Sequence, residues 1–341
     1  MEGSNMQQTT MTEVSVYDAV GLRLAHDLTQ ILPGKFKGSL FKKGHIITEE
    51  DIPKLLDIGK AHIYVLEMAE TDLHEDDAAL EMARVLCDET LFLTEPHEGK
   101  VNLKAKFKGV ARIDEALIYE INLLGDIALA TITTNRVVEA DQLIAATRVI
   151  PLIVEKSKIE WVKRICDNYR YEKGKSPLTI KPLPRREIGL ITTGSEVYNG
   201  RIRDKFGPAV KNKLESLGSV VVEQRFAPDD RDIIVKEIHS LKQKGYDMII
   251  VTGGMSVDPD DRTPGAIKAA GTDIVSYGTP MLPGSMLLVG YLEETPILGL
   301  PGCVMHDEYT SFDVLLPRIL LGEKIEREDI VKLGYGGLLG R

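Results

Sequence analysis

Strand-like and helix-like segments alternate from Arg185 to about Leu321, and this alternation restricts the fold more than any other feature of the chain. Apolar runs that begin near residues 188, 219 and 248 have the character of buried strands. The segments between them carry apolar residues at helical spacing, namely Phe206, Val210, Leu214 and Leu217, and then Ile233, Ile234 and Ile238. We therefore predict an α/β fold with a mostly parallel, doubly wound sheet, whose ligands bind at the carboxyl ends of the strands.

The pattern continues after Gly271 with three more apolar runs, at residues 273–276, 287–290 and 296–300. A last helix is predicted from His306 to Leu321, and Pro317 should kink or end it. Asp229 is a possible N-cap of the helix that carries Ile233.

The loop after the run at residues 248–251 predicts a site for phosphate and a metal ion. Gly253 and Gly254 lack the Cβ atoms that would keep a ligand from the backbone, and Thr263 followed by Pro264 is typical of an N-cap and a first helical position. Carboxylates repel a phosphate unless a cation lies between them, and Mg²⁺ binds one or two carboxylates together with water and phosphate oxygens. A solvated acidic turn is the alternative. The loop supplies Thr252, Gly253, Gly254, Ser256, Asp258, Asp260 and Asp261.

A second loop of the same kind follows the run that begins at Ile188. Its residues are Thr193, Gly194, Ser195 and Glu196. Backbone N–H groups and hydroxyls of such a loop suit a phosphate, although a loop rich in Thr and Ser also arises simply to satisfy a turn. Two such strand ends predict one shared crevice.

Five motifs in this order resemble the molybdenum cofactor biosynthesis domain, which molybdopterin adenylyltransferases, molybdopterin molybdenumtransferases and competence/damage-inducible proteins share. The motifs are Gly194-Ser195-Glu196, Asp204-Lys205-Phe206-Gly207-Pro208, Thr252-Gly253-Gly254, Asp261-Arg262-Thr263-Pro264 and Gly299-Leu300-Pro301-Gly302. The resemblance covers about two fifths of the chain and implies the domain's fold and a molybdopterin ligand. Since Asp261 aligns with the family's essential aspartate, the resemblance implies a role for Asp261 and Asp258 in catalysis, and for Asp261 and Asp260 in binding Mg²⁺.

The resemblance also implies a set of ligand-binding residues. They are Thr193, Gly194, Ser195, Glu196, Asp204, Thr252, Gly253, Gly254, Ser256, Pro283, Gly284, Ser285, Pro301, Gly302 and Cys303. For Asp204 the alternative is a helix N-cap and nothing more. Cys303 and His306 have a C-x-x-H spacing, but one such pair cannot complete a tetrahedral metal site.

Two loops depart from the molybdenumtransferase pattern. Ser285 stands where that family carries lysine, and Cys303 stands where it carries asparagine. The long N-terminal half and the loop at residues 299–302 favour Mg²⁺-assisted insertion of molybdate into molybdopterin or its adenylylated form. Three alternatives stay open: a molybdopterin adenylyltransferase, a nucleotide pyrophosphatase of the competence-protein type, and a molybdopterin-binding or carrier protein without catalysis.

The N-terminal half is predicted to contain two further modules. We place a disordered tail at residues 1–12, a small β-rich module at 13–70, a mixed α/β module at 71–172, a linker at 173–186, the molybdopterin-binding domain at 187–322 and an extension at 323–341. Thr48 should cap a helix at residues 49–56, and apolar spacing predicts another helix within residues 71–87. Residues 99–110 suggest a β-segment. The patterns at 113–124 and 143–154 suit helix or strand.

Composition limits the partners of this chain. A formal charge of −10 and a pI near 5.3 argue against nucleic acid as a ligand. The sequence contains no uninterrupted run of 18 apolar residues, so no membrane span is predicted. Its three scattered cysteines, Cys87, Cys166 and Cys303, fit a reducing cytoplasm. The basic run Lys35, Lys37, Lys42 and Lys43 has no obvious acidic ligand of its own, so we predict a homodimer in which it lies near the partner's acidic loop.

Overall fold

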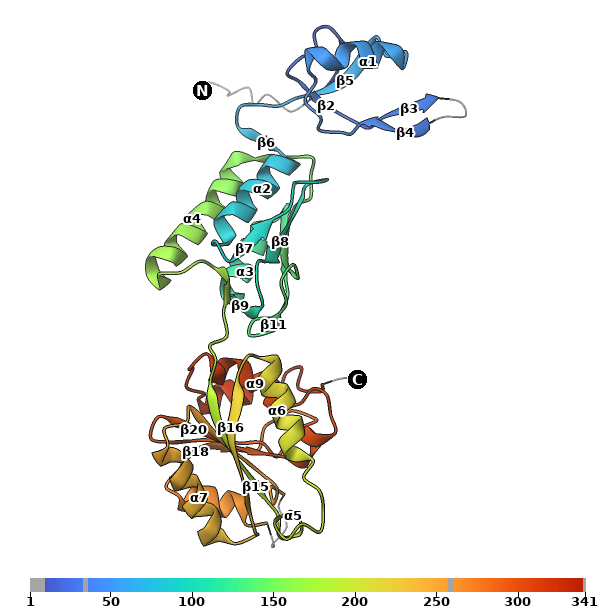
Figure 1. Cartoon of the computed structure of the whole chain (residues 1–341). Coiled ribbons are helices and arrows are strands. Elements are labelled where there is room, and N and C mark those ends of the chain that lie inside the picture. The colour runs from blue at the N-terminus through green and yellow to red at the C-terminus, as the bar shows by residue number, and fades with distance from the viewer. Residues whose placement is uncertain (1–9, 33–35, 257–260, 340–341) are drawn as a thin grey trace. The chain divides into compact units, whose positions relative to one another are not determined.

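The computed structural model describes residues 10–32, 36–256 and 261–339, and it divides into two compact units (Figure 1). The first unit contains residues 1–107, 112–134 and 139–180, and the second contains residues 108–111, 135–138 and 181–341. Three residues of the sequence predictions, Lys35, Asp258 and Asp260, lie outside the described ranges.

A six-stranded sheet in the second unit confirms the predicted α/β fold. Its order is β16-β15-β17-β20-β19-β18. The strands are β15 (Glu187–Thr193), β16 (Val220–Ala227), β17 (Met248–Thr252), β18 (Asp273–Tyr277), β19 (Leu288–Leu292) and β20 (Thr295–Leu300). The first four strands in the order are parallel, whereas β19 runs antiparallel to both β20 and β18.

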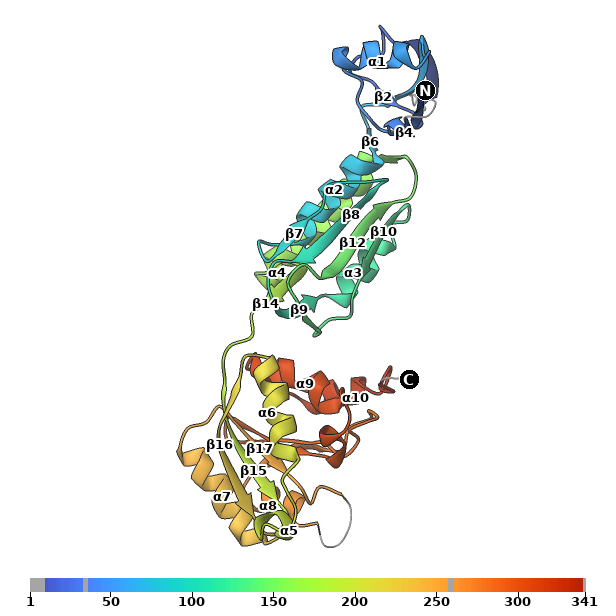
Figure 2. The same cartoon turned by 45° about the vertical axis from the view of Figure 1, so that its right-hand side comes forward.

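Helices cover both faces of this sheet, which explains why β17 is buried at every position (Figures 1 and 2). Met248 and Ile250 join one core with residues of α6 (Phe206–Ser216), α9 (Ser311–Leu320) and α10 (Arg327–Lys332). Ile249 and Val251 point the other way, into a core with α7 (Arg231–Gln243) and α8 (Thr263–Ala269). Successive side chains of a strand face opposite sides, so a strand between two helical layers is apolar along nearly its whole length.

Two details of the helix predictions in this unit were wrong, and one of the two outcomes predicted for Pro317 is excluded. Thr263 is the first residue of α8 rather than its N-cap. The last helix begins at Ser311 because Thr310 and Asp313 form a capping box, and a short 3-10 helix, η2 (Gly302–Met305), precedes it. Pro317 lies inside α9 and does not end it, since the helix continues to Leu320.

The N-terminal part of the first unit is a small β-rich arrangement. Strands β1 (Thr10–Ser15), β5 (His62–Glu67) and β2 (Arg23–Leu24) form one sheet in that order, and β3 (Leu28–Leu32) pairs with β4 (Phe36–Phe41) as a hairpin. The predicted helix after Thr48 is present as η1 (Glu49–Asp51) and α1 (Ile52–Asp57). Of the tail expected at residues 1–12, residues 1–9 lie outside the described ranges, whereas Thr10 begins β1.

The rest of the first unit packs two helices on one face of a sheet. The antiparallel order is β10-β12-β8-β7, with β10 (Ile127–Thr131), β12 (Leu143–Val149), β8 (Lys100–Ala105) and β7 (Leu91–Leu93). Helices α2 (Glu75–Leu86) and α4 (Lys156–Lys173) lie side by side (Figures 1 and 2). Shorter elements are β6 (Asp72–His74), β13 (Ile153–Glu155) and β14 (Leu178–Lys181). Two more short strands, β9 (Gly109–Ile113) and β11 (Val137–Val138), pair with each other and lie wholly or mostly in segments assigned to the second unit.

The two segments whose pattern suited helix or strand adopt different structures. Asp114 accepts a hydrogen bond from the Leu117 amide and starts α3 (Glu115–Asn122), whereas residues 143–149 form a strand in the middle of the sheet. Among the described residues, none of the helices is long and apolar enough to cross a membrane.

Candidate functional site

The two predicted loops follow neighbouring parallel strands. Thr192 of β15 lies opposite Thr252 of β17, so the chain leaves both strands at the same edge of the sheet. The hydroxyls of Thr193 and Thr263 lie 3.1 Å apart in a buried position and join the first loop to the start of α8. Thr252 is fully buried, and its hydroxyl donates to the Ile191 carbonyl at 3.4 Å. The sheet thus fixes the separation of the loops.

Gly253 is required by the close approach of the two loops. Its φ is +92°, and a Cβ atom there would lie 2.4 Å from the Thr193 carbonyl oxygen, closer than van der Waals contact permits. Gly254 also has a positive φ, +54°, and a Cβ there would be 3.5 Å from Oδ1 of Asp261. The glycine pair therefore lets the backbone pass between the first loop and the Asp261 carboxylate.

Asp261 is half-buried at the start of α8 and is oriented by the second loop. Ser256 Oγ donates to Asp261 Oδ2 at 2.5 Å. The same loop is held from the side by Tyr277, whose hydroxyl lies 3.0 Å from the Met255 carbonyl and 3.1 Å from the Ser256 carbonyl. Burial raises the pKa of Tyr277, and the negative charge of Asp261 raises it further. Tyr277 therefore stays a neutral hydrogen-bond donor.

Asp229 is a site residue that the sequence analysis missed. Its Oδ2 accepts a hydrogen bond from the Ser195 amide at 2.7 Å, and its own amide donates to Ser195 Oγ at 3.2 Å. The N-cap of α7 is instead Asp230, which accepts from the Asp232 and Ile233 amides. Two adjacent aspartates are equivalent by local pattern, and only the fold assigns one to capping and the other to the first loop.

Asp204 accepts hydrogen bonds at the start of α6, whose N-cap position is Lys205, and it also lines a cavity. Oδ1 accepts from the Phe206 amide at 2.8 Å, and Oδ2 accepts from Gln224 Nε2 at 2.6 Å. Gln224 Nε2 also donates to the Thr192 hydroxyl at 3.0 Å, which links Asp204 to the end of β15. Asp204 is therefore not the N-cap itself, although its carboxylate binds the first amides of α6 beside the predicted phosphate loop.

Two cavities lie along the loops. The larger, of about 540 Å³, is lined by residues that include Thr193, Gly194, Glu196, Asp204, Asp229, Gly253, Gly254 and Asp261. Its lining also includes Arg203, Lys205 and His306, none of which was predicted as a ligand-binding residue. The smaller, of about 290 Å³, is lined by Gly253, Gly254, Ser256, Asp261, Pro301 and Gly302, among others. An anionic ligand would find both glycine-rich backbone and cations here.

The remaining predicted residues lie apart from these two cavities. Pro283, Gly284, Ser285 and Cys303 are not among the lining residues of either cavity. Gly284, with a φ of +114°, packs against Ser311 Oγ, and a Cβ there would lie 2.2 Å from that atom. Cys303 is half-buried, and burial raises its pKa, so its thiol stays protonated. Gly284 thus supports the start of α9, and Cys303 lies in the 3-10 helix that precedes it.

The donor atoms present fit a Mg²⁺ ion bound through few protein ligands. Among the described residues there is no group of three His, Cys, Asp or Glu side chains that could hold a metal by themselves. Mg²⁺ does not need such a group, because it commonly uses one or two carboxylates and keeps water and phosphate oxygens. Asp261, with the hydroxyl of Ser256 beside it, is the described carboxylate in this position.

An α/β domain with two glycine-containing loops at adjacent strand ends defines the class of this protein. Within that class, residues 189–320 match the family described as "Probable molybdopterin binding domain". This match confirms the resemblance predicted from the five motifs. Residues 13–67 match a second family, described as "Domain of unknown function (DUF8806)".

Curated relatives match over part of this chain. The molybdopterin molybdenumtransferase of Staphylococcus aureus (strain COL) is 29% identical over 130 residues, which are 36% of this chain and 31% of the relative. A CinA-like protein of Mycobacterium sp. (strain JLS) is 33% identical over 75 residues, 22% of this chain and 18% of the relative. The chain thus spans about a third or less of the length of these relatives.

Solved structures match over a similar share of the chain. The molybdopterin biosynthesis enzyme MoaB from Thermus thermophilus is 22% identical in sequence, with a TM-score of 0.34. The match covers 40% of this chain and 98% of the MoaB chain. The protein CinA from Thermoplasma acidophilum is 18% identical, with a TM-score of 0.33, and the match covers 41% of this chain and 99% of the CinA chain.

Proposed function

We propose that this chain binds molybdopterin at the carboxyl ends of β15 and β17 and acts in molybdenum cofactor biosynthesis. One observation carries the proposal: in a domain of the molybdopterin-binding family, Gly253 brings the two loops together around Asp261. Backbone amides near Thr193 and Gly254, with the cations Arg203 and Lys205, provide donors and positive charge for a phosphate. A phosphate at the Ser195 amide has to displace the Asp229 carboxylate.

The reaction we propose is insertion of molybdate into molybdopterin or its adenylylated form. The molybdenumtransferase named among the relatives supports this choice. Asp261 would hold Mg²⁺, and Ser256 keeps the Asp261 carboxylate oriented. When bound, Mg²⁺ supplies a positive charge that fixes phosphate oxygens and polarises them. Asp258 and Asp260 remain proposed as a further catalytic carboxylate and a further metal ligand.

Binding without catalysis is the second candidate, and one observation favours it. Ser285 and Cys303 stand where the molybdenumtransferase pattern has lysine and asparagine, so a positive charge and an amide are absent next to Met286 and Gly302, which line the smaller cavity. A protein of this kind would carry molybdopterin and turn it over slowly, because losing one preorganised donor costs roughly 10² to 10³ in rate. Product analysis after incubation with molybdopterin and molybdate separates the two candidates.

Replacing Asp261 tests the site itself. We expect Asp261→Asn to remove Mg²⁺-dependent molybdopterin binding, measured by calorimetry with and without Mg²⁺. The melting temperature should stay near that of the wild type, since asparagine is nearly isosteric with aspartate and its side-chain oxygen can still accept the hydrogen bond from Ser256. Asp273→Asn is the matched control, because Asp273 is an exposed carboxylate that begins β18. Equal Mg²⁺ dependence in wild type and Asp261→Asn would refute the site.

We also propose a homodimer in the cytoplasm. The prediction that the basic run has no acidic partner in its own chain is wrong for Lys43, whose Nζ lies 3.1 Å from Glu75 Oε1. Lys42 remains an exposed cation next to it. Light scattering at micromolar concentration should give twice the mass of the 37.8 kDa chain. A monomer mass would reject the dimer.

A further inference from the structure

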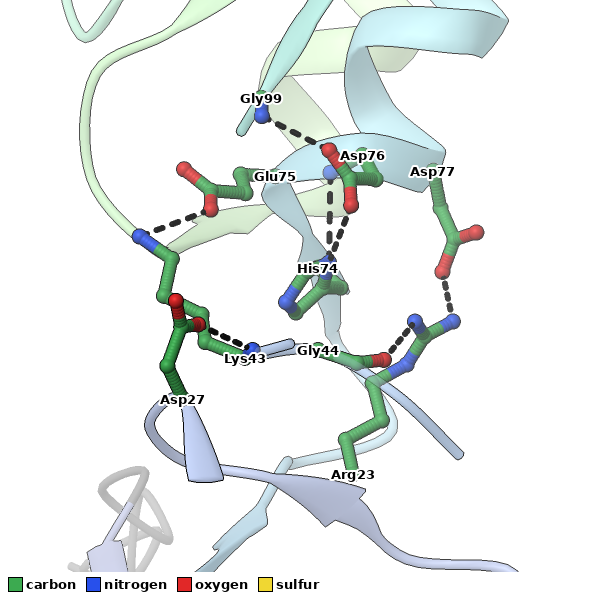
Figure 3. Close-up of polar contacts among 9 residues, drawn as sticks. All are labelled: Arg23, Asp27, Lys43, Gly44, His74, Glu75, Asp76, Asp77 and Gly99. Carbon is green, nitrogen blue, oxygen red and sulfur yellow. Dashed lines mark hydrogen bonds and ion pairs between the residues drawn. The ribbon is translucent and has the colours of Figure 1, made fainter. Parts of the chain in front are cut away.

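Two ion pairs join the N-terminal segment, residues 13–67, to the first turn of α2 (Figure 3). Lys43 Nζ lies 3.1 Å from Oε1 of Glu75, whose side chain is only 5% exposed. The Arg23 guanidinium donates to the Asp77 carboxylate and, at 3.2 Å, to the Gly44 carbonyl. Because α2 belongs to the following part of the first unit, these pairs hold that part and the N-terminal segment together.

The imidazole of His74 is enclosed between these two pairs. His74 is the N-cap of α2, and its side chain has no exposed surface. A Cβ atom on Gly44 would lie 2.6 Å from Cε1 of the ring, so the backbone of the N-terminal segment closes directly on the imidazole (Figure 3). Gly44 has a φ of +83°, which also favours glycine. We call Arg23, Lys43, Gly44, His74, Glu75 and Asp77 the α2 latch.

Hydrogen bonding fixes the proton on the His74 ring. Nδ1 accepts a hydrogen bond from the Asp76 amide at 3.3 Å, so Nδ1 carries a lone pair and the ring proton of neutral His74 is on Nε2. Among the described residues, Nε2 has no hydrogen-bond partner. Asp76 is itself held in place, because its Oδ1 accepts from the Gly99 amide at 2.7 Å. With the N-terminal segment held against α2, the α2 latch therefore accommodates only the neutral imidazole. We call this the closed form.

A second proton on His74 is unfavourable for three structural reasons. It would occupy Nδ1 and break the N-cap hydrogen bond. It would also place a positive charge at the positive end of α2. Because the side chain has no exposed surface, solvent would not stabilise that charge. Burial lowers the pKa of His74, and the charge of Arg23 lowers it further, whereas the carboxylates of Glu75, Asp76 and Asp77 oppose this effect. The balance leaves the pKa below its usual value.

We propose that the α2 latch is an acid-sensitive contact, in which protonation of His74 releases the N-terminal segment from α2. In the open form His74 meets water and has an ordinary pKa of about 6.5. Below that pH the open form takes up one proton that the closed form does not, so opening is favoured as the pH falls. The opening constant rises by at most about tenfold per pH unit, until the pH reaches the lower pKa of the closed form.

Other titrating groups lie close to the latch and have to be separated from His74. His26, His45 and His97 line a cavity of about 770 Å³ beside it, together with Lys42, Lys43, Lys54, Asp27, Asp51, Glu75, Asp76 and Glu98. Side-chain carboxylates titrate mostly below about pH 5. Measurements between about pH 7.5 and 5.5 therefore avoid them. A variant of His74 alone keeps the other imidazoles, so the difference between it and the wild type isolates the contribution of His74.

The test uses amide hydrogen exchange of the full chain, with every rate divided by the intrinsic rate at the same pH. We expect the Asp76 and Gly99 amides of the wild type to exchange up to about tenfold faster for each unit below about pH 6.5. In His74→Asn they should show no such rise, because asparagine caps a helix but takes up no proton in this range. The same rise in both proteins would overturn the proposal.

Two further measurements keep the test decisive if His74→Asn folds poorly. Gly44→Ala puts a methyl group against the His74 ring, and we expect its Asp76 and Gly99 amides to exchange fast already at about pH 7.5. In the unmodified chain, nitrogen chemical shifts of the His74 ring should show a neutral imidazole with its proton on Nε2. A ring charged at about pH 7.5, or a Gly44→Ala protein as protected as the wild type, would contradict the latch.

Discussion

At the residue scale, the geometry around Asp261 is set by side chains that orient its carboxylate or hold its loop. Ser256 donates to Asp261, and Tyr277 binds the carbonyls of Met255 and Ser256 from β18. The sequence motifs contain Asp261 but not Tyr277. Tyr277 lies in β18, outside the loop of Asp261, and no local pattern indicates its role. A positioning role of this kind becomes visible only when the loop and the strand are placed side by side.

We predict that Tyr277→Phe weakens the effect of Mg²⁺ more than it weakens the fold. Losing one partly exposed hydrogen bond costs about 1 kcal/mol, and a loop loosened by that amount should raise the Mg²⁺ concentration for half-maximal molybdopterin binding roughly fivefold. Calorimetry at a series of Mg²⁺ concentrations measures the shift.

Tyr291→Phe is the matched control for Tyr277→Phe. Tyr291 is buried, and its hydroxyl accepts a hydrogen bond from the Ile325 amide at 2.7 Å, away from both loops. This change should lower the melting temperature at least as much and leave the Mg²⁺ dependence unchanged. If both variants shift the Mg²⁺ dependence equally, Tyr277 has no specific positioning role.

At the element scale, the ends of β15 and β17 create the site because two loops approach within contact distance. We predict that Gly253→Ala disrupts the site and destabilises the domain by several kcal/mol, because the new Cβ meets the Thr193 carbonyl at 2.4 Å and the φ of +92° is strained for alanine. Thermal unfolding measured by circular dichroism checks the stability.

Gly265→Ala provides the contrast on a neighbouring element. Gly265 lies within α8, on a helix face with open space where a Cβ would be. Alanine at that position should stabilise the protein by about 0.5–1 kcal/mol, since it removes freedom from the unfolded chain and favours the helix. Equal stability of the two variants would mean that the close approach at Gly253 is absent in solution.

At the scale of the whole molecule, the C-terminal domain extends further than its motifs. Ile325 and Ile330 follow α9 and are buried in the core that contains α6 and β17. We predict that a fragment of residues 181–339 folds and binds molybdopterin, whereas a fragment ending at residue 321 is several kcal/mol less stable, because it lacks these two core side chains. Urea unfolding of both fragments provides the measurement. Equal stability would show that α10 is dispensable.

The sequence by itself determined the order of strands and helices, the mostly parallel sheet and the two glycine-containing loops. These features follow from local periodicity and from the conformational freedom of glycine, which every segment carries within itself. The start of α9 was misplaced, since the capping box of Thr310 and Asp313 competes with a helical pattern that extends further back. Asp204, Asp261 and Gly253 were found because each lies in a short sequence motif, which can be recognised without the fold.

Only the tertiary structure decided which polar groups meet. Asp229 rather than Asp230 reaches Ser195, Tyr277 reaches the loop of Ser256, and Lys43 finds Glu75. Each contact joins residues that are far apart in the chain, so it depends on strand register and on how the elements pack, and no local pattern contains that information. Neighbouring residues of the same type, such as Asp229 and Asp230, acquire different roles because the backbone directs their side chains to different partners.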